Sequence, residues 1–248
     1  MCGGDTHMLD LTKGFVDLHN IGFTDFVISH TENAEAKIDS YEKLLSMSLI
    51  MRANQRDPSV TVDNQEKIFP HIKLILEWLR NTDFYTSPAS ANNHEAYIGG
   101  LLEHTLSAYT ELMGLRSVPK FKSVVDTQWW SAVFAILAHD WCKIGRYESY
   151  YKNVKNPDTG VWEQIAAFRT KHDDTVRFGH GTQSLIMAMQ LCNSKLTSLS
   201  FEEMAAIRWH MDAWDIGHYD DWDLNKCNEK VPMVRMIQFA DQLAITTY

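Results

Sequence analysis

The sequence predicts a mainly α-helical protein, a helical bundle interrupted by one small β-hairpin insertion. Apolar residues recur at spacings of three and four along much of the chain, as in helices that bury one face. Residues 128–141 are apolar almost all round, which is typical of a central buried helix. The only strand signal lies between Tyr147 and Arg169, where two runs rich in aromatic and β-branched residues flank the turn-forming residues 156–160.

Start and stop signals support the individual helices. Gly114 ends one helix, Ser200 and Glu203 form a capping box for another, and Pro232 stands just inside the start of the last. The expected helical ranges are 36–53, 65–80, 101–114, 128–141, 180–193, 201–212 and 232–246. We therefore expect residues 61–248 to form one functional domain, preceded by an N-terminal extension, residues 1–60, to which no role is assigned.

Composition narrows the class of protein. The chain has 248 residues, 45% hydrophobic and 22% charged, which is ordinary for a globular protein. Its four cysteines are scattered without a C-x-x-C pair, which argues for a reducing compartment and against a cysteine-rich zinc site. We see no leader segment and no apolar run long enough to cross a membrane, so we expect a cytoplasmic protein that does not bind membranes.

The net charge bears on possible ligands. With 23 basic and 32 acidic side chains, the chain carries −9 at pH 7 and repels polyphosphate at long range. Binding to duplex DNA is therefore not expected. A small phosphorylated substrate held at a bound cation remains compatible with this charge.

Six histidines and aspartates stand where apolar residues are expected. One histidine on an apolar helix face is usually a satisfied core residue. Several on different segments are harder to pair with one another, and a metal centre solves the problem because it accepts nitrogen and oxygen ligands together. The six residues are His104, His139, Asp140, His180, His210 and Asp241. Such ligands suit two divalent ions (Mn, Fe, Co, Ni or Zn) that share a carboxylate.

The order of these residues resembles the HD superfamily of metal-dependent phosphohydrolases, in its two-metal branch. Residues 94–106 (HEAYIGGLLEHTL) are similar to the first-histidine segment of the HD domain of a bacterial 3′→5′ exoribonuclease. Residues 139–145 (HDWCKIG) resemble the HD-x-x-K-x-G form, and residues 177–181 (RFGHG) resemble a Gly-His step that follows a short hairpin. The resemblance covers roughly residues 70–246 and implies an HD-domain helical bundle.

The resemblance also implies roles. His104, His139, Asp140 and Asp241 would hold one metal, and Asp140 would bridge to a second metal held by His180 and His210. A metal-bound hydroxide would then cleave a phosphate ester of a small nucleotide-like substrate, with Asp140 and Lys143 as catalytic residues and Lys143 on a phosphate oxygen.

Four other polar residues near the six candidate ligands each allow two interpretations. His94 would reach the substrate from the lip of the site or cap the helix that follows it. Arg146 would bind phosphate or sugar, or simply lie on the surface after a helix end. Asp212 and Asp215 would orient His210, or form only a charged helix end.

Three other functions share the same ligands. The first is a mixed-valence di-iron oxygenase of the HD type. The second is a 3′→5′ exoribonuclease-like activity, although residues 1–70 show no strand-rich pattern for the OB domain that accompanies it. The third is a nucleotide sensor that keeps the metal centre without catalysis.

Overall fold

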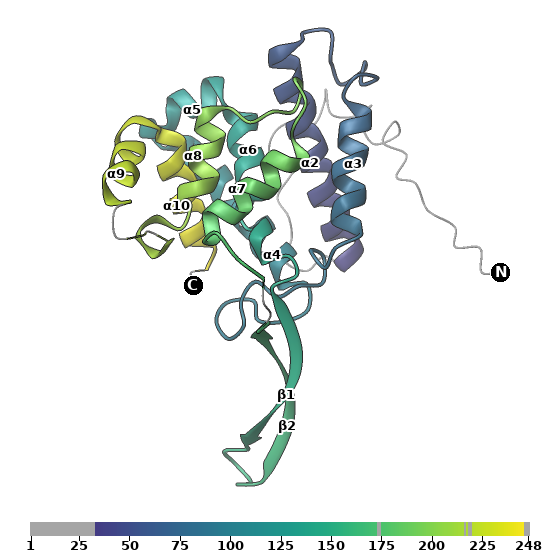
Figure 1. The fold of residues 1–248 in the computed structure, drawn as a ribbon, viewed down its shortest axis with the longest axis vertical. Helices are drawn as coiled ribbons and strands as arrows, with labels where there is room; N and C mark the ends of the chain where they lie inside the picture. Colours follow the sequence, from purple (N-terminus) through teal and green to yellow (C-terminus); the bar gives the residue numbers. More distant parts are fainter. Residues whose placement is uncertain (1–32, 173–174, 216, 218–219, 246–248) are drawn as a thin grey trace, which may run out of the picture.

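The computed structural model describes residues 33–172, 175–215, 217 and 220–245 (Figure 1). Its secondary structure is mainly α-helical with one two-stranded antiparallel sheet, which confirms the predicted fold class. No described helix combines the length and apolarity needed to cross a membrane. The elements are α2 (Ala34–Arg56), α3 (Phe69–Arg80), α4 (Gly100–Gly114), α5 (Lys122–Thr127), α6 (Trp129–Ala138), β1 (Tyr147–Lys155), β2 (Trp162–Thr170), α7 (His180–Leu191), α8 (Phe201–Trp209), α9 (Asp221–Lys230) and α10 (Pro232–Ala244).

Helix α6 is the central buried helix that its all-round apolar sequence predicts. Residues 132–138 are at most 1% exposed, and α2, α4, α8 and α10 all pack against this helix. It ends at Ala138, three residues earlier than expected, because Asp140 leaves the helical conformation (φ −107°, ψ 16°). The helix therefore delivers His139 and Asp140 at its carboxyl end, deep inside the protein.

Helix α2 belongs to the same core as the rest of the domain. The Tyr41 hydroxyl donates to the Leu137 carbonyl oxygen (2.9 Å) and accepts from the Trp141 indole (3.0 Å). Residues 34–56, which belong to the expected N-terminal extension, carry apolar side chains that pack against α6. The earlier part of the expected extension lies outside the described residues.

A buried ion pair joins α2 to α8. Arg52 Nε and Nη2 lie 2.6 and 2.7 Å from the two carboxylate oxygens of Glu203, and both side chains are at most 1% exposed. The guanidinium also lies 4.1 Å from the centre of the Phe134 ring. Glu203 completes the predicted capping box with Ser200, so one carboxylate fixes both the start of α8 and its contact with α2.

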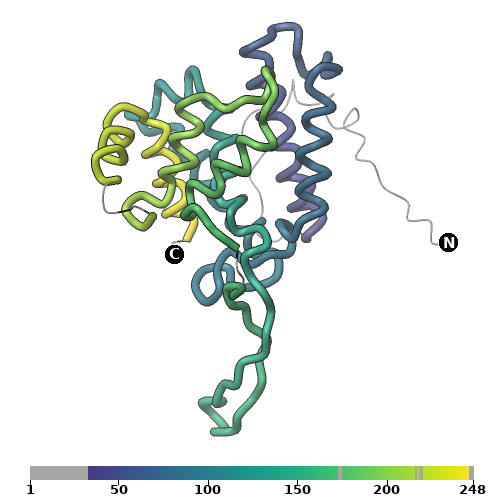
Figure 2. The backbone as a smooth tube through the Cα atoms, in the orientation of Figure 1, coloured from purple at the N-terminus to yellow at the C-terminus, as the bar shows by residue number. Residues whose placement is uncertain are grey.

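Strands β1 and β2 form the predicted hairpin, in a register that pairs Tyr147 with Thr170 and Lys155 with Trp162. Figures 1 and 2 show that this hairpin extends away from the helices. At its base the Lys171 amide donates to the Arg146 carbonyl oxygen (2.9 Å). The hairpin therefore leaves and returns at one place, between the turn after α6 and the start of α7.

Replacing Arg52 by alanine is expected to lower the free energy of unfolding by about 3–5 kcal/mol, because Glu203 is left buried without its partner. Urea unfolding followed by circular dichroism measures this loss. The control is Lys73→Ala, which removes an exposed ion pair with Glu77 and should cost less than about 0.5 kcal/mol. Equal losses in the two variants would contradict the stabilising role of the buried pair.

Candidate metal centre

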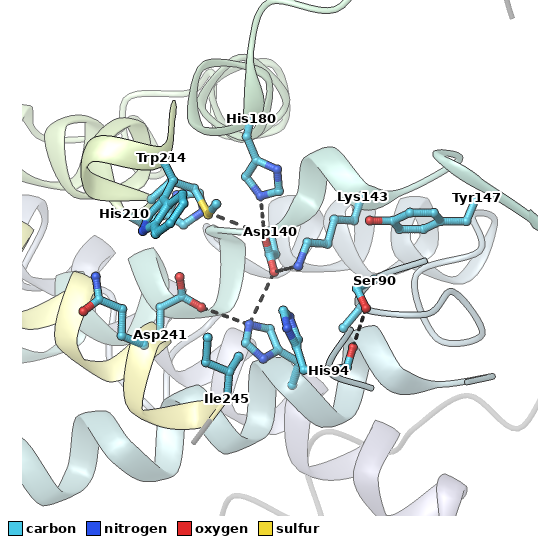
Figure 3. Close-up of a pocket in the computed structure, with 14 residues that line it drawn as sticks. Ser90, His94, Asp140, Lys143, Tyr147, His180, His210, Trp214, Asp241 and Ile245 are labelled. Carbon is cyan, nitrogen blue, oxygen red and sulfur yellow. Dashed lines mark hydrogen bonds and ion pairs between the residues drawn. The ribbon is translucent and has the colours of Figure 1, made fainter. Parts of the chain in front are cut away.

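Five helices bring the six predicted ligands together around the Asp140 carboxylate. Figure 3 shows His180, His210 and Asp241 of this set near Asp140. His180 Nε2 lies 2.6 Å from Asp140 Oδ1, and His210 Nε2 lies 3.7 Å from the same oxygen. On the other side, His139 Nε2 and His104 Nε2 lie 3.3 and 3.5 Å from Asp140 Oδ2. Asp140 is thus shared by all four imidazoles.

Asp241 supplies a second carboxylate from α10. Its Oδ1 lies 3.0 Å from His104 Nε2 and 3.4 Å from His139 Nε2, so these two rings stand between the two aspartates. Among the described residues, four groups of side chains have ligand atoms within 4.8 Å of one another and could hold a metal ion: His104, His139 and Asp241; His139, Asp140 and His210; Asp140, Cys142 and His180; and His94, Glu95 and His104. The thiol is the weakest donor, because burial and Asp140 raise the pKa of Cys142 to about 12.

The ring orientations of His139 and His210 suit a metal. Each residue follows the last residue of its helix, α6 or α8, and each Nδ1 lies within 2.8 Å of a carbonyl oxygen three residues earlier. Because a carbonyl only accepts, Nδ1 carries a proton, so Nε2 is the atom that has the lone pair once the ring is neutral. Both Nε2 atoms are buried without a hydrogen-bond partner. The carboxyl ends of the two helices add partial negative charge that favours a cation.

His180 is held through its backbone. The Asp215 carboxylate accepts from the amides of His180 (3.0 Å) and Gly181 (2.8 Å), and so caps the start of α7. This differs from the expected role of Asp215 beside His210, because the chain after α8 turns back toward α7. Asp212 instead lies 3.6 Å from Arg235.

The charges of the centre balance one another. Burial by itself lowers the pKa of His139, but Asp140 and Asp241 outweigh this and raise it to about 10. Burial acts to raise the pKa of Asp140, yet Lys143 and His139 hold it well below its ordinary value. Burial likewise acts to raise the pKa of Asp241, but His104 and His139 hold it well below its ordinary value, so both carboxylates are ionised. A cation bound here would displace the proton from His139.

Lys143 lies beside Asp140. Its Nζ is 2.6 Å from Asp140 Oδ2, and the side chain is almost fully buried. The turn that carries it is fixed by Gly145, whose left-handed backbone (φ 68°) favours glycine and whose amide donates to Asp83 Oδ1 (2.7 Å). Asp83 lies in a polar loop, and no sequence pattern predicts this contact.

A cavity of about 240 Å³ opens above the centre. Ser90, His94, Lys143 and Tyr147 form its polar wall, and Met211, Trp214 and Ile245 form an apolar wall. In Figure 3, Lys143 and Tyr147 lie on one side of Asp140, and Trp214 and Ile245 on the other. Of the two residues predicted to bind substrate, His94 lines the cavity and Arg146 does not. The apolar wall was not foreseen, because its residues are ordinary helix-end side chains in the sequence.

Comparisons with protein-family models, curated proteins and solved structures found no match to this chain. The interpretation of the site therefore depends on its own geometry. That geometry establishes buried clusters of histidine and aspartate that could hold metal ions.

Replacing Gly181 by alanine is expected to disrupt the centre, because the added Cβ would lie 2.0 Å from the Arg208 carbonyl oxygen in α8. We expect α7 and α8, which carry His180 and His210, to separate at a cost of about 1–3 kcal/mol, with weaker metal binding. Urea unfolding and the metal content after dialysis measure both effects.

Gly114→Ala is the matched control. No atom lies within 4 Å of a Cβ at this helical position, so alanine should stabilise the protein by about 0.4–1 kcal/mol. If both alanine variants keep wild-type stability and metal content, α7 and α8 do not need their close approach.

Proposed function

We propose that this chain is a metal-dependent phosphohydrolase of the HD type that cleaves a phosphate ester of a small nucleotide-like substrate. The observation that carries the proposal is the sharing of Asp140 by four imidazoles, with two buried Nε2 atoms that lack any hydrogen-bond partner. In this arrangement His104, His139, Asp140 and Asp241 hold one divalent ion, and Asp140, His180 and His210 hold a second.

The donor set fits such ions. Imidazole and carboxylate together suit Mn, Fe, Co, Ni or Zn, and the neutral Cys142 thiol does not favour a thiolate site. Two bound ions would supply an activated water at neutral pH and positive charge for the developing phosphate oxygens. Asp140 orients both halves of the centre, since its two oxygens face different histidines.

Lys143 gives the cavity a positive side chain for a phosphate group, despite the negative charge of the whole chain. Tyr147 lines the same wall, and burial raises its pKa, which keeps its phenol protonated as a hydrogen-bond donor. Ser90 and His94 add further polar groups to this wall. These contacts support a phosphorylated substrate.

The apolar wall supports a substrate with an aromatic ring. Trp214 is 85% exposed although it lines the cavity, and its neighbour Asp215 anchors this turn to the start of α7. An exposed indole beside a phosphate-binding centre provides a stacking surface for a base. The cavity is smaller than those that enclose drug-sized ligands, so we place the phosphate inside and the ring against the rim.

Asp140→Asn is expected to reduce phosphate release from nucleoside mono-, di- or triphosphates with Mn²⁺ at least about a hundredfold, because it removes the shared charge of both metal sites. Metal analysis should find about two equivalents in the wild-type protein and fewer in the variant. Glu148→Gln, an exposed hairpin residue paired with Arg169, is the control and should keep full activity. Full activity in Asp140→Asn would refute the proposal.

Further measurements on the wild-type protein separate the alternative functions. Two irons with oxygen consumption and no phosphate release would favour the di-iron oxygenase. Stepwise release of mononucleotides from RNA would favour the exoribonuclease-like activity. Nucleotide binding with intact metals and no product would favour the sensor.

Trp214→Ala is expected to raise the KM for a nucleoside monophosphate about 5- to 150-fold, since base–aromatic stacking contributes about 1–3 kcal/mol. The KM for ribose 5-phosphate, which has no base, should not change. Trp222→Ala removes an exposed tryptophan from α9, away from the cavity, and serves as the control. A similar rise for both substrates would show that Trp214 shapes the cavity without contacting a base.

A further inference from the structure

His104 differs from the other buried histidines in how its ring is held. In His139 and His210 the Nδ1 atom meets the carbonyl oxygen three residues earlier. The corresponding carbonyl for His104 belongs to Leu101, which accepts a hydrogen bond from the Thr105 hydroxyl (2.8 Å). His104 Nδ1 is buried without a hydrogen-bond partner, in a side chain that is 1% exposed. The hydrogen bond that holds this ring joins Nε2 to Asp241 Oδ1 (3.0 Å), so a metal at Nε2 would leave the ring to be oriented by a group at Nδ1.

Glu95 faces this nitrogen. Its Oε2 lies 3.8 Å from His104 Nδ1 and is itself buried without a hydrogen-bond partner. An unpaired buried carboxylate oxygen beside an unpaired ring nitrogen is costly, and one hydrogen bond would satisfy both. That bond needs the two atoms to approach by about 0.8 Å, which a small rotation of either side chain provides.

The backbone at Glu95 adopts a strained conformation. Its φ of 44° is left-handed, which among the described non-glycine residues is shared only with Asp212. The loop holds this conformation tightly: the Glu95 carbonyl oxygen accepts from the Ala89 amide (3.1 Å), and a Cβ at Gly100 would lie 2.0 Å from it. A strained residue whose carboxylate faces a site suggests a function for that carboxylate.

We propose that Glu95 is a positioning residue of the metal centre. Its carboxylate accepts a hydrogen bond from the Nδ1–H of His104, and this keeps Nε2, which faces Asp140 and Asp241, as the metal-binding atom. The inference rests on the metal centre of the proposed function, but not on the reaction. His94 belongs to the same surroundings, with its ring centre 5.0 Å from that of His104.

The test separates positioning from a structural role. Glu95→Gly removes the carboxylate and relieves the left-handed backbone, whereas Glu95→Gln keeps the length and one accepting oxygen. The control is Glu103→Gln, since Glu103 precedes His104 in the chain but pairs with Lys37 (2.9 Å). Mn²⁺ affinity is measured by competition with a chelator, and stability by urea unfolding of the chelated protein.

We expect Glu95→Gly to bind Mn²⁺ about 10- to 100-fold more weakly than the wild type, with an unfolding midpoint equal to or above the wild-type value. Glu95→Gln should lose less affinity, and Glu103→Gln none. Mn²⁺ affinity is measured without turnover. The test of Glu95 therefore gives the same result whether or not the protein proves to be a hydrolase.

Three results would overturn the inference. One is wild-type affinity in Glu95→Gly, which would show that the carboxylate does not influence the centre. Another is a loss of Mn²⁺ affinity in Glu95→Gly that accompanies an equally large loss of stability when the metal has been removed by chelator. The third is the loss of one whole metal equivalent while the others keep their affinity, which would make Glu95 and His94 ligands of a further ion.

Discussion

The burial of the Asp140 carboxylate is the constraint on which the rest of this structure depends. An ionised group in the interior is strongly destabilising unless charged or polar partners surround it. Here the partners come from every side: Lys143 from the next turn, and the four imidazoles from α4, α6, α7 and α8. Helix α10 adds Asp241, a second carboxylate, which lies beside His104 and His139. Five helices must therefore pack together before these buried charges have their partners.

The helices reach this point because their ends are defined. Helices α6 and α8 both stop just before the histidine that they deliver, and α7 begins at its own histidine under the cap of Asp215. At the opposite end of α8, Glu203 joins the cap to Arg52 of α2. Four of the six residues therefore lie at or next to helix termini, and His104 and Asp241 lie within α4 and α10, where backbone geometry fixes a side chain better than in a flexible loop.

Periodicity carried much of the prediction. Apolar stripes marked His104, His210 and Asp241, the end of an apolar helix marked His139 and Asp140, and the hairpin and the capping box also had sequence signals. His180 was singled out differently, at a helix start beside two glycines. The sequence could not identify partners that depend on distant loops, such as Asp83, Glu95 and Asp215. Helix α9 was also missed, because Leu224 is its only buried residue and leaves no apolar period.

The length of the hairpin is independent of the distance between the helices that it connects. Its base is closed between Arg146 and Lys171, while the paired strands lie outside the helical body. The distance between the turn that carries Lys143 and the start of α7 therefore does not depend on the length or sequence of the hairpin. Evolution can lengthen, shorten or rewrite residues 156–161 at the tip without moving the ligands, and a protein engineer can attach a reporter there for the same reason.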